Sequence, residues 1–211
     1  MKPNLFRSIS NSLAERFPLL PRIRRSFWGL LLFCGLFSLT DLSGENGISI
    51  SVKPLETTLH DSSVLIKQYA AGAVHAQGLF TIRNPTITQR ALFPGPFSGV
   101  DFITILCMAI GSVIIIRIIH KLEAKYVFRK DITHLIRLLG YLLMAHGTFT
   151  LYRIVGYLPT TVEFLTDNTY TSIRSFPIML YAELYVSLVV LAMASLYNKG
   201  IQLQEEQELT V

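Results

Sequence analysis

Residues 176–197 read FPIMLYAELYVSLVVLAMASLY, and the polar, acidic stretch NKGIQLQEEQELTV follows at residues 198–211. The first stretch has roughly the 20 apolar residues that an α-helix needs to cross a bilayer. Because lipid cannot hydrogen-bond to a backbone, such a stretch forms a helix that satisfies its own N–H and C=O groups. One carboxylate, that of Glu183, interrupts it. The sequence therefore predicts a membrane protein and directs attention to the few polar residues held in lipid.

Three further apolar stretches occur at residues 26–40 (SFWGLLLFCGLFSLT), 102–119 (FITILCMAIGSVIIIRII) and 132–155 (ITHLIRLLGYLLMAHGTFTLYRIV). We therefore expect an all-α integral membrane protein with four transmembrane helices and a small mixed extracytoplasmic insert. The first of the three is short and follows several arginines, which is also typical of the apolar part of a signal peptide. No small-x-small cleavage site follows it, so we favour an uncleaved anchor over a signal peptide.

The composition agrees with a chain held largely in lipid. Of its 211 residues, 51% are hydrophobic and 16% are charged, against about 25% charged residues in a typical soluble domain. The net charge of +5 comes from residues that flank the apolar stretches. They form no basic stripe, so we expect no direct binding of nucleic acid. Cys34 and Cys107 both lie in apolar stretches, which predicts inert thiols and no disulfide.

Lysine and arginine residues are spread unevenly among the connecting segments. Residues 1–25 carry six of them and residues 120–131 carry four, whereas residues 156–175 carry only Arg174. Because basic segments stay in the cytoplasm, we expect a multi-pass protein of the cell (inner) membrane with both termini cytoplasmic. The predicted order is a basic cytoplasmic segment (1–25), transmembrane helix one (26–40), an extracytoplasmic insert (41–101), helix two (102–119), a basic cytoplasmic link (120–131), helix three (132–155), an extracytoplasmic loop (156–175), helix four (176–197) and an acidic cytoplasmic tail (198–211).

The insert at residues 41–101 contains two patterns typical of strands. Residues 48–53 alternate apolar and polar, and residues 78–83 alternate less regularly and could pair with them. Residues 61–73 between them could be helical. Two strands and one helix are too few for an independent core, so the insert is expected to depend on the rest of the protein.

Ionisable groups inside a membrane are costly and need a partner. Arg153 lies near the outer end of the third predicted helix, and Glu183 lies about two turns into the fourth from the same side. Antiparallel neighbours bring the two to similar depth, which predicts an Arg153–Glu183 ion pair. His146, in the middle of the third helix, could pick up a proton or a metal ion, but a hydrogen bond to a hydroxyl or carbonyl on the next helix is the commoner role of a lone histidine. Gly140 and Gly147 share one face of that helix and would allow a second helix to approach closely.

The sequence contains no catalytic signature. It has no His-Glu-x-x-His zinc motif, no phosphate-binding glycine loop and no Gly-x-Ser-x-Gly motif. We therefore expect no enzyme activity, no cofactor and no metal. The acidic residues Glu205, Glu206 and Glu208 suggest instead a docking site for a cytoplasmic partner, or a latch onto the basic link at residues 120–131.

The chain ends in Gly200-Ile-Gln-Leu-Gln-Glu-Glu-Gln-Glu-Leu-Thr-Val211. This ending, together with Phe128-Arg-Lys-Asp131 leading into Ile136-Arg-Leu-Leu-Gly140, resembles the bacterial family named domain of unknown function 2975. The resemblance implies four spans and no established activity. Some members look to be encoded beside a small helix-turn-helix regulator, so the resemblance also implies a regulatory partner.

Two functions from different classes follow. The first is a non-enzymatic binding or regulatory protein, such as a sensor, that lies in the lipid bilayer and acts with a cytoplasmic regulatory partner. The alternative is a small-solute or ion transporter or channel subunit that uses Arg153, His146 and Glu183. The sequence leaves homo-oligomerisation, the ligand and the trigger open.

Overall fold

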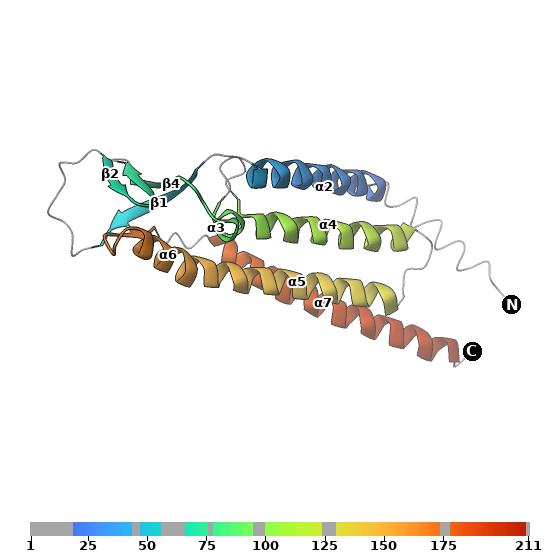
Figure 1. The fold of residues 1–211 in the computed structure, drawn as a ribbon. Coiled ribbons are helices and arrows are strands. Elements are labelled where there is room, and N and C mark those ends of the chain that lie inside the picture. Colours follow the sequence, from blue (N-terminus) through green and yellow to red (C-terminus); the bar gives the residue numbers. More distant parts are fainter. Residues whose placement is uncertain are drawn as a thin grey trace. The chain divides into compact units, whose positions relative to one another are not determined.

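The computed structural model describes residues 19–43, 47–55, 66–75, 78–94, 100–123, 130–173 and 178–209, with all side chains except those of residues 41–43, 66–67, 123, 178–181 and 208–209. Figure 1 draws the helices and strands of these residues as a ribbon. By the contacts within the chain, the residues divide between two compact units. We call the unit that draws on residues 34–106 and 146–181 the sheet unit. The unit that draws on residues 1–33, 107–145 and 182–211 is the helix unit.

Helices account for most of the described chain. They are α2 (Leu20–Ser43), α3 (Ile87–Leu92), α4 (Phe102–Glu123), α5 (Lys130–Tyr152), the π-helical turn η2 (Arg153–Tyr157), α6 (Leu158–Leu165) and α7 (Ile178–Leu209). The elements α5, η2 and α6 follow one another without a break, so that residues Lys130–Leu165 form one helical segment of 36 residues.

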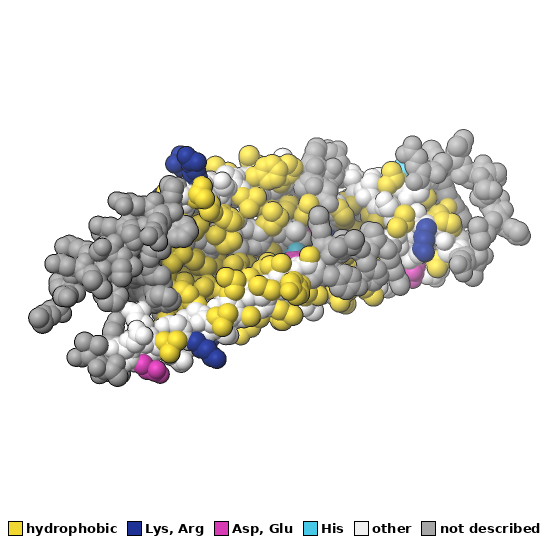
Figure 2. All heavy atoms as spheres, turned by 180° about the vertical axis from the view of Figure 1, so that it is seen from behind, with side chains coloured by type: hydrophobic (Ala, Val, Ile, Leu, Met, Phe, Trp, Pro, Cys, Tyr) yellow, Lys and Arg dark blue, Asp and Glu magenta, His cyan; other side chains and the backbone are white. Residues whose placement is uncertain are grey.

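Three helical segments of the described residues are long and apolar enough to cross a membrane, namely Phe102–Leu122, Lys130–Leu165 and Ala182–Gln207. Large apolar side chains on these helices are exposed, as contact with lipid requires; examples are Leu106 and Val113 on α4 and Leu188 and Leu196 on α7. Figure 2 shows one face of the molecule, where hydrophobic side chains cover much of the described surface and charged residues occur only at scattered points. These features are those of a membrane protein.

The strands form one antiparallel sheet. They are β1 (Ile48–Pro54), β2 (Ile66–Tyr69), β3 (Gly72–His75), β4 (Leu79–Ile82) and β5 (Tyr170–Ser172), in the order β2-β3-β4-β1-β5. Ile48 pairs with Ile82 in the register between β1 and β4, and Val52 pairs with Ser172 in the register between β1 and β5. Gly78, with a φ of 72°, supplies the left-handed conformation just before β4.

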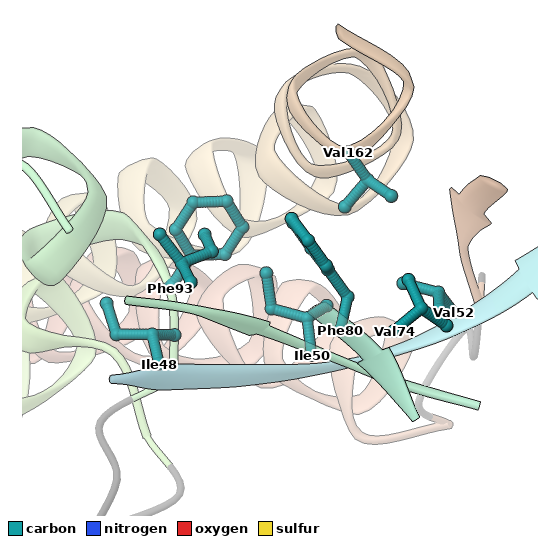
Figure 3. Packing of buried hydrophobic residues seen from close by; sticks show 8 residues of the cluster. Ile48, Ile50, Val52, Val74, Phe80, Phe93 and Val162 are labelled. Carbon is teal, nitrogen blue, oxygen red and sulfur yellow. The ribbon is translucent and has the colours of Figure 1, made fainter. Parts of the chain in front are cut away.

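The sheet unit has a hydrophobic core of its own. Alternation along β1 turns Ile48, Ile50 and Val52 to one face, where they are buried. Figure 3 shows Phe80 from β4 and Val162 from α6 pointing toward one another in this core. The other buried members are Val74, Ile82 and Phe93, and the partly buried residues around them are Tyr69, Tyr157, Leu158, Leu165 and Tyr170. Helix α6 therefore covers one face of the sheet.

The predicted fold class, an all-α protein with four transmembrane helices and a small insert, is wrong. The structure contains a five-stranded sheet, and three helical segments of the described residues meet the length and composition of a membrane span. Helix α2 is not among these segments. The prediction failed because β5 and α6 come from residues 158–172, far along the chain from the other strands. A local hydrophobic pattern cannot report such a distant pairing.

The strand predictions inside residues 41–101 fared better. The predicted pairing of residues 48–53 with residues 78–83 is confirmed by the register of β1 and β4. The helix predicted over residues 61–73 is wrong from residue 66 onward, where β2 and β3 form an antiparallel pair. Residues 61–65, like residues 1–18 of the predicted N-terminal segment, lie outside the described residues.

Candidate functional site

Four polar side chains meet within the sheet unit, and we call them the Asp101 cluster. Asp101 immediately precedes α4, and Thr104 lies in the first turn of that helix. His146 lies in α5, and Arg153 is the first residue of η2. All four belong to the sheet unit.

Asp101 caps the N-terminus of α4. Its Oδ1 accepts a hydrogen bond from the Thr104 backbone N–H at 2.9 Å, and its Oδ2 accepts one from the Thr104 hydroxyl at 2.7 Å. A capping carboxylate satisfies a backbone donor that has no partner inside the helix, which is worth about 1 kcal/mol. The negative charge is also favourable at this end of the helix dipole. The local sequence Asp101-Phe-Ile-Thr104 thus fixes where α4 begins.

Arg153 pairs with the same carboxylate. Its Nη1 lies 2.5 Å from Asp101 Oδ2 and also donates to the backbone carbonyl of Leu92 at 3.2 Å. The side chains of Asp101 and Arg153 are only 3% and 12% exposed. Among the described residues, Arg153 Nε is buried and has no hydrogen-bond partner. Removing one member of such a buried pair leaves the other charge uncompensated, at a cost of about 3–5 kcal/mol.

His146 extends the cluster through Thr104. The His146 Nε2 atom lies 2.9 Å from the Thr104 hydroxyl oxygen. That hydroxyl has one proton and gives it to Asp101 Oδ2. His146 Nε2 must therefore carry a hydrogen and donate it to the Thr104 hydroxyl oxygen.

The π-helical turn that begins with Arg153 has a cause in the sequence. Pro159 follows it and is buried. A proline inside a helix has no N–H to donate, and its ring clashes with the carbonyl four residues earlier, here that of Val155. The turn widens instead, so that the Leu158 N–H donates to the Arg153 carbonyl. The Thr160 hydroxyl donates to the Gly156 carbonyl at 2.7 Å.

The helix unit has a different charged arrangement near the end of α7. Lys130 Nζ lies 3.0 Å from Glu205 Oε1, and Lys121 Nζ lies 3.0 Å from Asp131 Oδ2. The side chains are 71% and 54% exposed in the Lys130–Glu205 pair and 35% and 53% exposed in the Lys121–Asp131 pair, so each pair is worth about 0–1 kcal/mol. Glu206 is exposed, and the side chain of Glu208 is not described.

Close contact between α5 and α7 in the helix unit depends on a glycine. A Cβ atom added at Gly140 would lie 2.7 Å from two side-chain carbons of Leu191. No real side chain tolerates that distance unless its neighbour moves. The prediction that Gly140 allows a second helix to approach closely is confirmed.

The family model described as "Protein of unknown function (DUF2975)" matches residues 83–211. The chain belongs to the DUF2975 family. Neither a curated protein nor a solved structure matches it. The matched region of this DUF2975 protein begins directly after β4 and contains both the Asp101 cluster and the Lys130–Glu205 pair.

Two of the residues singled out in the DUF2975 sequence, His146 and Arg153, belong to one hydrogen-bonded series with Asp101 and Thr104. Glu183 is partly buried on α7 and belongs to the helix unit. The predicted Arg153–Glu183 pair therefore stays a prediction, while the ion-pair partner that the structure gives Arg153 is Asp101.

Sequence reasoning missed Asp101 and Thr104. The signal was present, because an aspartate directly before an apolar stretch is a typical helix start. A cap alone, however, does not indicate that the same carboxylate forms an ion pair with Arg153, which lies near the end of the 132–155 stretch.

The Asp101 cluster consists of an ion pair, a helix cap and an imidazole hydrogen bond. Within the part of the chain that the structure describes, no group of three or more His, Cys, Asp or Glu side chains could hold a metal ion. Chemically, the cluster can fix two helix ends relative to one another inside the sheet unit. Its buried charges are already paired.

Proposed function

We propose that this DUF2975 protein is a non-enzymatic regulatory or binding protein of the bacterial inner membrane that senses a signal and acts with a cytoplasmic partner. The observation that carries the proposal is the Lys130–Glu205 pair, in which an acidic helix end meets a basic one at 3.0 Å. Both charges are exposed, so a partner can reach and compete for either of them. The exposed apolar residue Leu203 lies three residues before Glu206, on the same face of α7, and adds an apolar contact for a partner that binds Glu206.

The proposed orientation follows from charge. Lys121, at the end of α4, and Lys130, at the start of α5, flank a link that is basic in sequence. Basic links stay in the cytoplasm. If the three apolar segments each cross the membrane once, the end of α7 lies on the same side as this link. Glu205 and Glu206 then lie on the cytoplasmic side, where a cytoplasmic protein can contact them.

A transporter is the second candidate, because His146, Thr104, Asp101 and Arg153 form a continuous hydrogen-bonded series. A transport site must exchange its partners during each cycle. Asp101 already accepts bonds from the backbone and hydroxyl of Thr104 and from the Arg153 guanidinium. This saturation favours a structural and regulatory role over transport, whether or not Glu183 contributes.

The test is affinity capture of the intact protein in mild detergent. The Glu205→Gln/Glu206→Gln double variant keeps the helix and removes two exposed charges. We expect wild type to retain a specific cytoplasmic protein that the double variant loses. Asp167→Asn, which removes an exposed carboxylate of the sheet unit, is the matched control and keeps the partner. Capture of the same proteins by wild type and by the double variant would contradict the proposal.

The transport alternative has its own readout. Purified protein in proteoliposomes is compared with the Asp101→Asn variant for flux of protons or small ions. We expect no flux above that of protein-free vesicles from either protein. Flux from wild type that Asp101→Asn abolishes would favour the transporter.

A further inference from the structure

The π-helical turn η2 interrupts a helical segment that is otherwise α-helical on both sides. A π turn corresponds to one extra residue in an α-helix, and such turns are rare and frequent at functional sites. The residue that opens this turn, Arg153, is also the cation of the Asp101 cluster. One residue thus joins an unusual backbone turn to a buried ion pair.

Two features hold the turn in its π form. Pro159 disfavours ordinary α-helical bonding at this point, as argued above, and it is a fixed feature of the covalent chain. The Arg153 guanidinium ties the turn to Asp101 at the start of α4 and to the Leu92 carbonyl at the end of α3. Of these two features, only the ion pair can open without a change in the covalent chain.

The turn determines how α6 meets the sheet. Val162 of α6 is fully buried in the core, and Leu158 and Tyr157 pack at its margin. The ring of Tyr157 lies 5.8 Å, centroid to centroid, from that of Phe93. Phe93 directly follows Leu92, whose carbonyl Arg153 holds. Any change in the helical phase after Arg153 therefore changes which side of α6 faces the sheet.

We propose that η2 is a conformational switch that the Arg153–Asp101 pair holds in its π state. When the pair opens, the Leu158 N–H transfers from the Arg153 carbonyl to that of Ile154, as in an α-helix, and the helix kinks at Pro159 to relieve the clash of its ring with the Val155 carbonyl. The extra residue is then absorbed, and α6 turns by about 100°, the rotation per residue of an α-helix. Val162 leaves the core and another face of α6 takes its place.

This switch goes beyond the proposed function and does not depend on it. A sensor and a transporter could each use a helix that turns against the sheet. The two ideas are tested separately, because the capture experiment alters the end of α7 and the experiment below alters only the sheet unit.

The experiment compares amide hydrogen exchange in full-length protein in detergent. The Asp101→Asn/Arg153→Gln double variant breaks the ion pair without leaving a single unpaired charge. We expect exchange of amides in η2 and α6 to accelerate roughly tenfold or more, while amides in β1 and β4 keep their protection. Asp131→Asn, which breaks the exposed pair with Lys121, is the control and leaves exchange in η2 and α6 unchanged.

A second comparison separates a switch from a simple loss of packing. Deletion of Val155, whose side chain is exposed, removes the extra residue and leaves both flanking helices in phase. In the deletion background, breaking the ion pair should not accelerate exchange in α6, because no π turn remains to be absorbed. Equal acceleration with and without the deletion would overturn the switch.

Two further outcomes also overturn the proposal. One is equal protection of α6 in wild type and in the pair-broken variant. The other is a loss of protection that spreads equally through β1 and β4, since that result indicates unfolding of the whole unit. If the double variant does not fold, Arg153→Lys, which keeps the charge but not the planar guanidinium, takes its place. Its expected result is a smaller acceleration confined to η2 and α6.

Discussion

Replacing Asp101 with asparagine isolates the charge of the buried ion pair. Asparagine caps a helix about as well as aspartate, so the backbone bond to Thr104 at the start of α4 can persist. What is lost is the negative charge 2.5 Å from Arg153 Nη1. Because the Arg153 side chain is only 12% exposed, its charge is left uncompensated in a buried position. We expect Asp101→Asn to lower the free energy of unfolding by about 3–5 kcal/mol.

Companion variants divide this cost into its parts. Asp101→Ala also loses the cap and should cost about 1 kcal/mol more than Asp101→Asn. The Asp101→Asn/Arg153→Met double variant removes both charges and should return to within about 2 kcal/mol of wild type. Asp131→Asn, at the exposed pair with Lys121, should cost no more than about 1 kcal/mol.

The assay is denaturant-induced unfolding of purified protein in mild detergent, followed by a probe of the sheet unit. A cost for Asp101→Asn equal to that of Asp131→Asn would refute the reasoning. The single variant Arg153→Met completes the comparison. If the cost of Asp101→Asn/Arg153→Met equals the sum of the costs of Asp101→Asn and Arg153→Met, the two residues do not form a direct pair, because such a pair gives non-additive costs.

Three further stability changes follow from backbone geometry and are measured by the same unfolding assay. Gly72→Ala places a Cβ atom 1.9 Å from the Thr81 carbonyl oxygen. It should therefore lower the free energy of unfolding by about 3 kcal/mol or more, because β3 must move away from β4. A loss below about 1 kcal/mol would contradict the pairing of β3 with β4. Gly140→Ala should cost about 1–3 kcal/mol, and adding Leu191→Ala should recover part of the loss by making room. Asn168 has a φ of 58°, so Asn168→Gly should be neutral or stabilising by up to about 1 kcal/mol, whereas Asn168→Val should destabilise.

The sequence was most informative where structure is set by local pattern. The apolar stretches that begin at residues 102 and 132 correspond to α4 and α5, because a membrane span depends only on length and composition. The alternation at residues 48–53 likewise predicted β1 and its pairing with β4. In both cases the deciding signal is a pattern inside a single segment of the sequence.

The sheet unit as a whole could not be predicted in this way. Its fifth strand, β5, pairs with β1 across more than 100 residues, and Val162 completes the core from α6, at the end of the helical segment Lys130–Leu165. Neither relation leaves a periodic pattern in the sequence. Pro159 was a visible sign that the helix changes character there, but a proline predicts an interruption and not its form.

The site was predicted in part. Arg153 was correctly identified as a residue in need of a partner, and the structure gives it Asp101. The sequence argument compared depth in the membrane and predicted Glu183 as the partner of Arg153, because it considered only residues inside the apolar stretches. Asp101 stands just outside the stretch at residues 102–119, at the helix cap, where depth along the membrane does not single it out.

The most direct test of the proposed membrane arrangement is the labelling of single cysteines in intact bacterial cells. Cys34 and Cys107, the two native cysteines, are replaced by serine, and either Ser49→Cys on β1 or Glu206→Cys on α7 is introduced. Both positions are exposed. A membrane-impermeant maleimide should label the β1 position in intact cells and the α7 position only after the cells are opened. Labelling of the α7 position in intact cells would contradict a cytoplasmic end of α7, and the proposed regulatory contact with it.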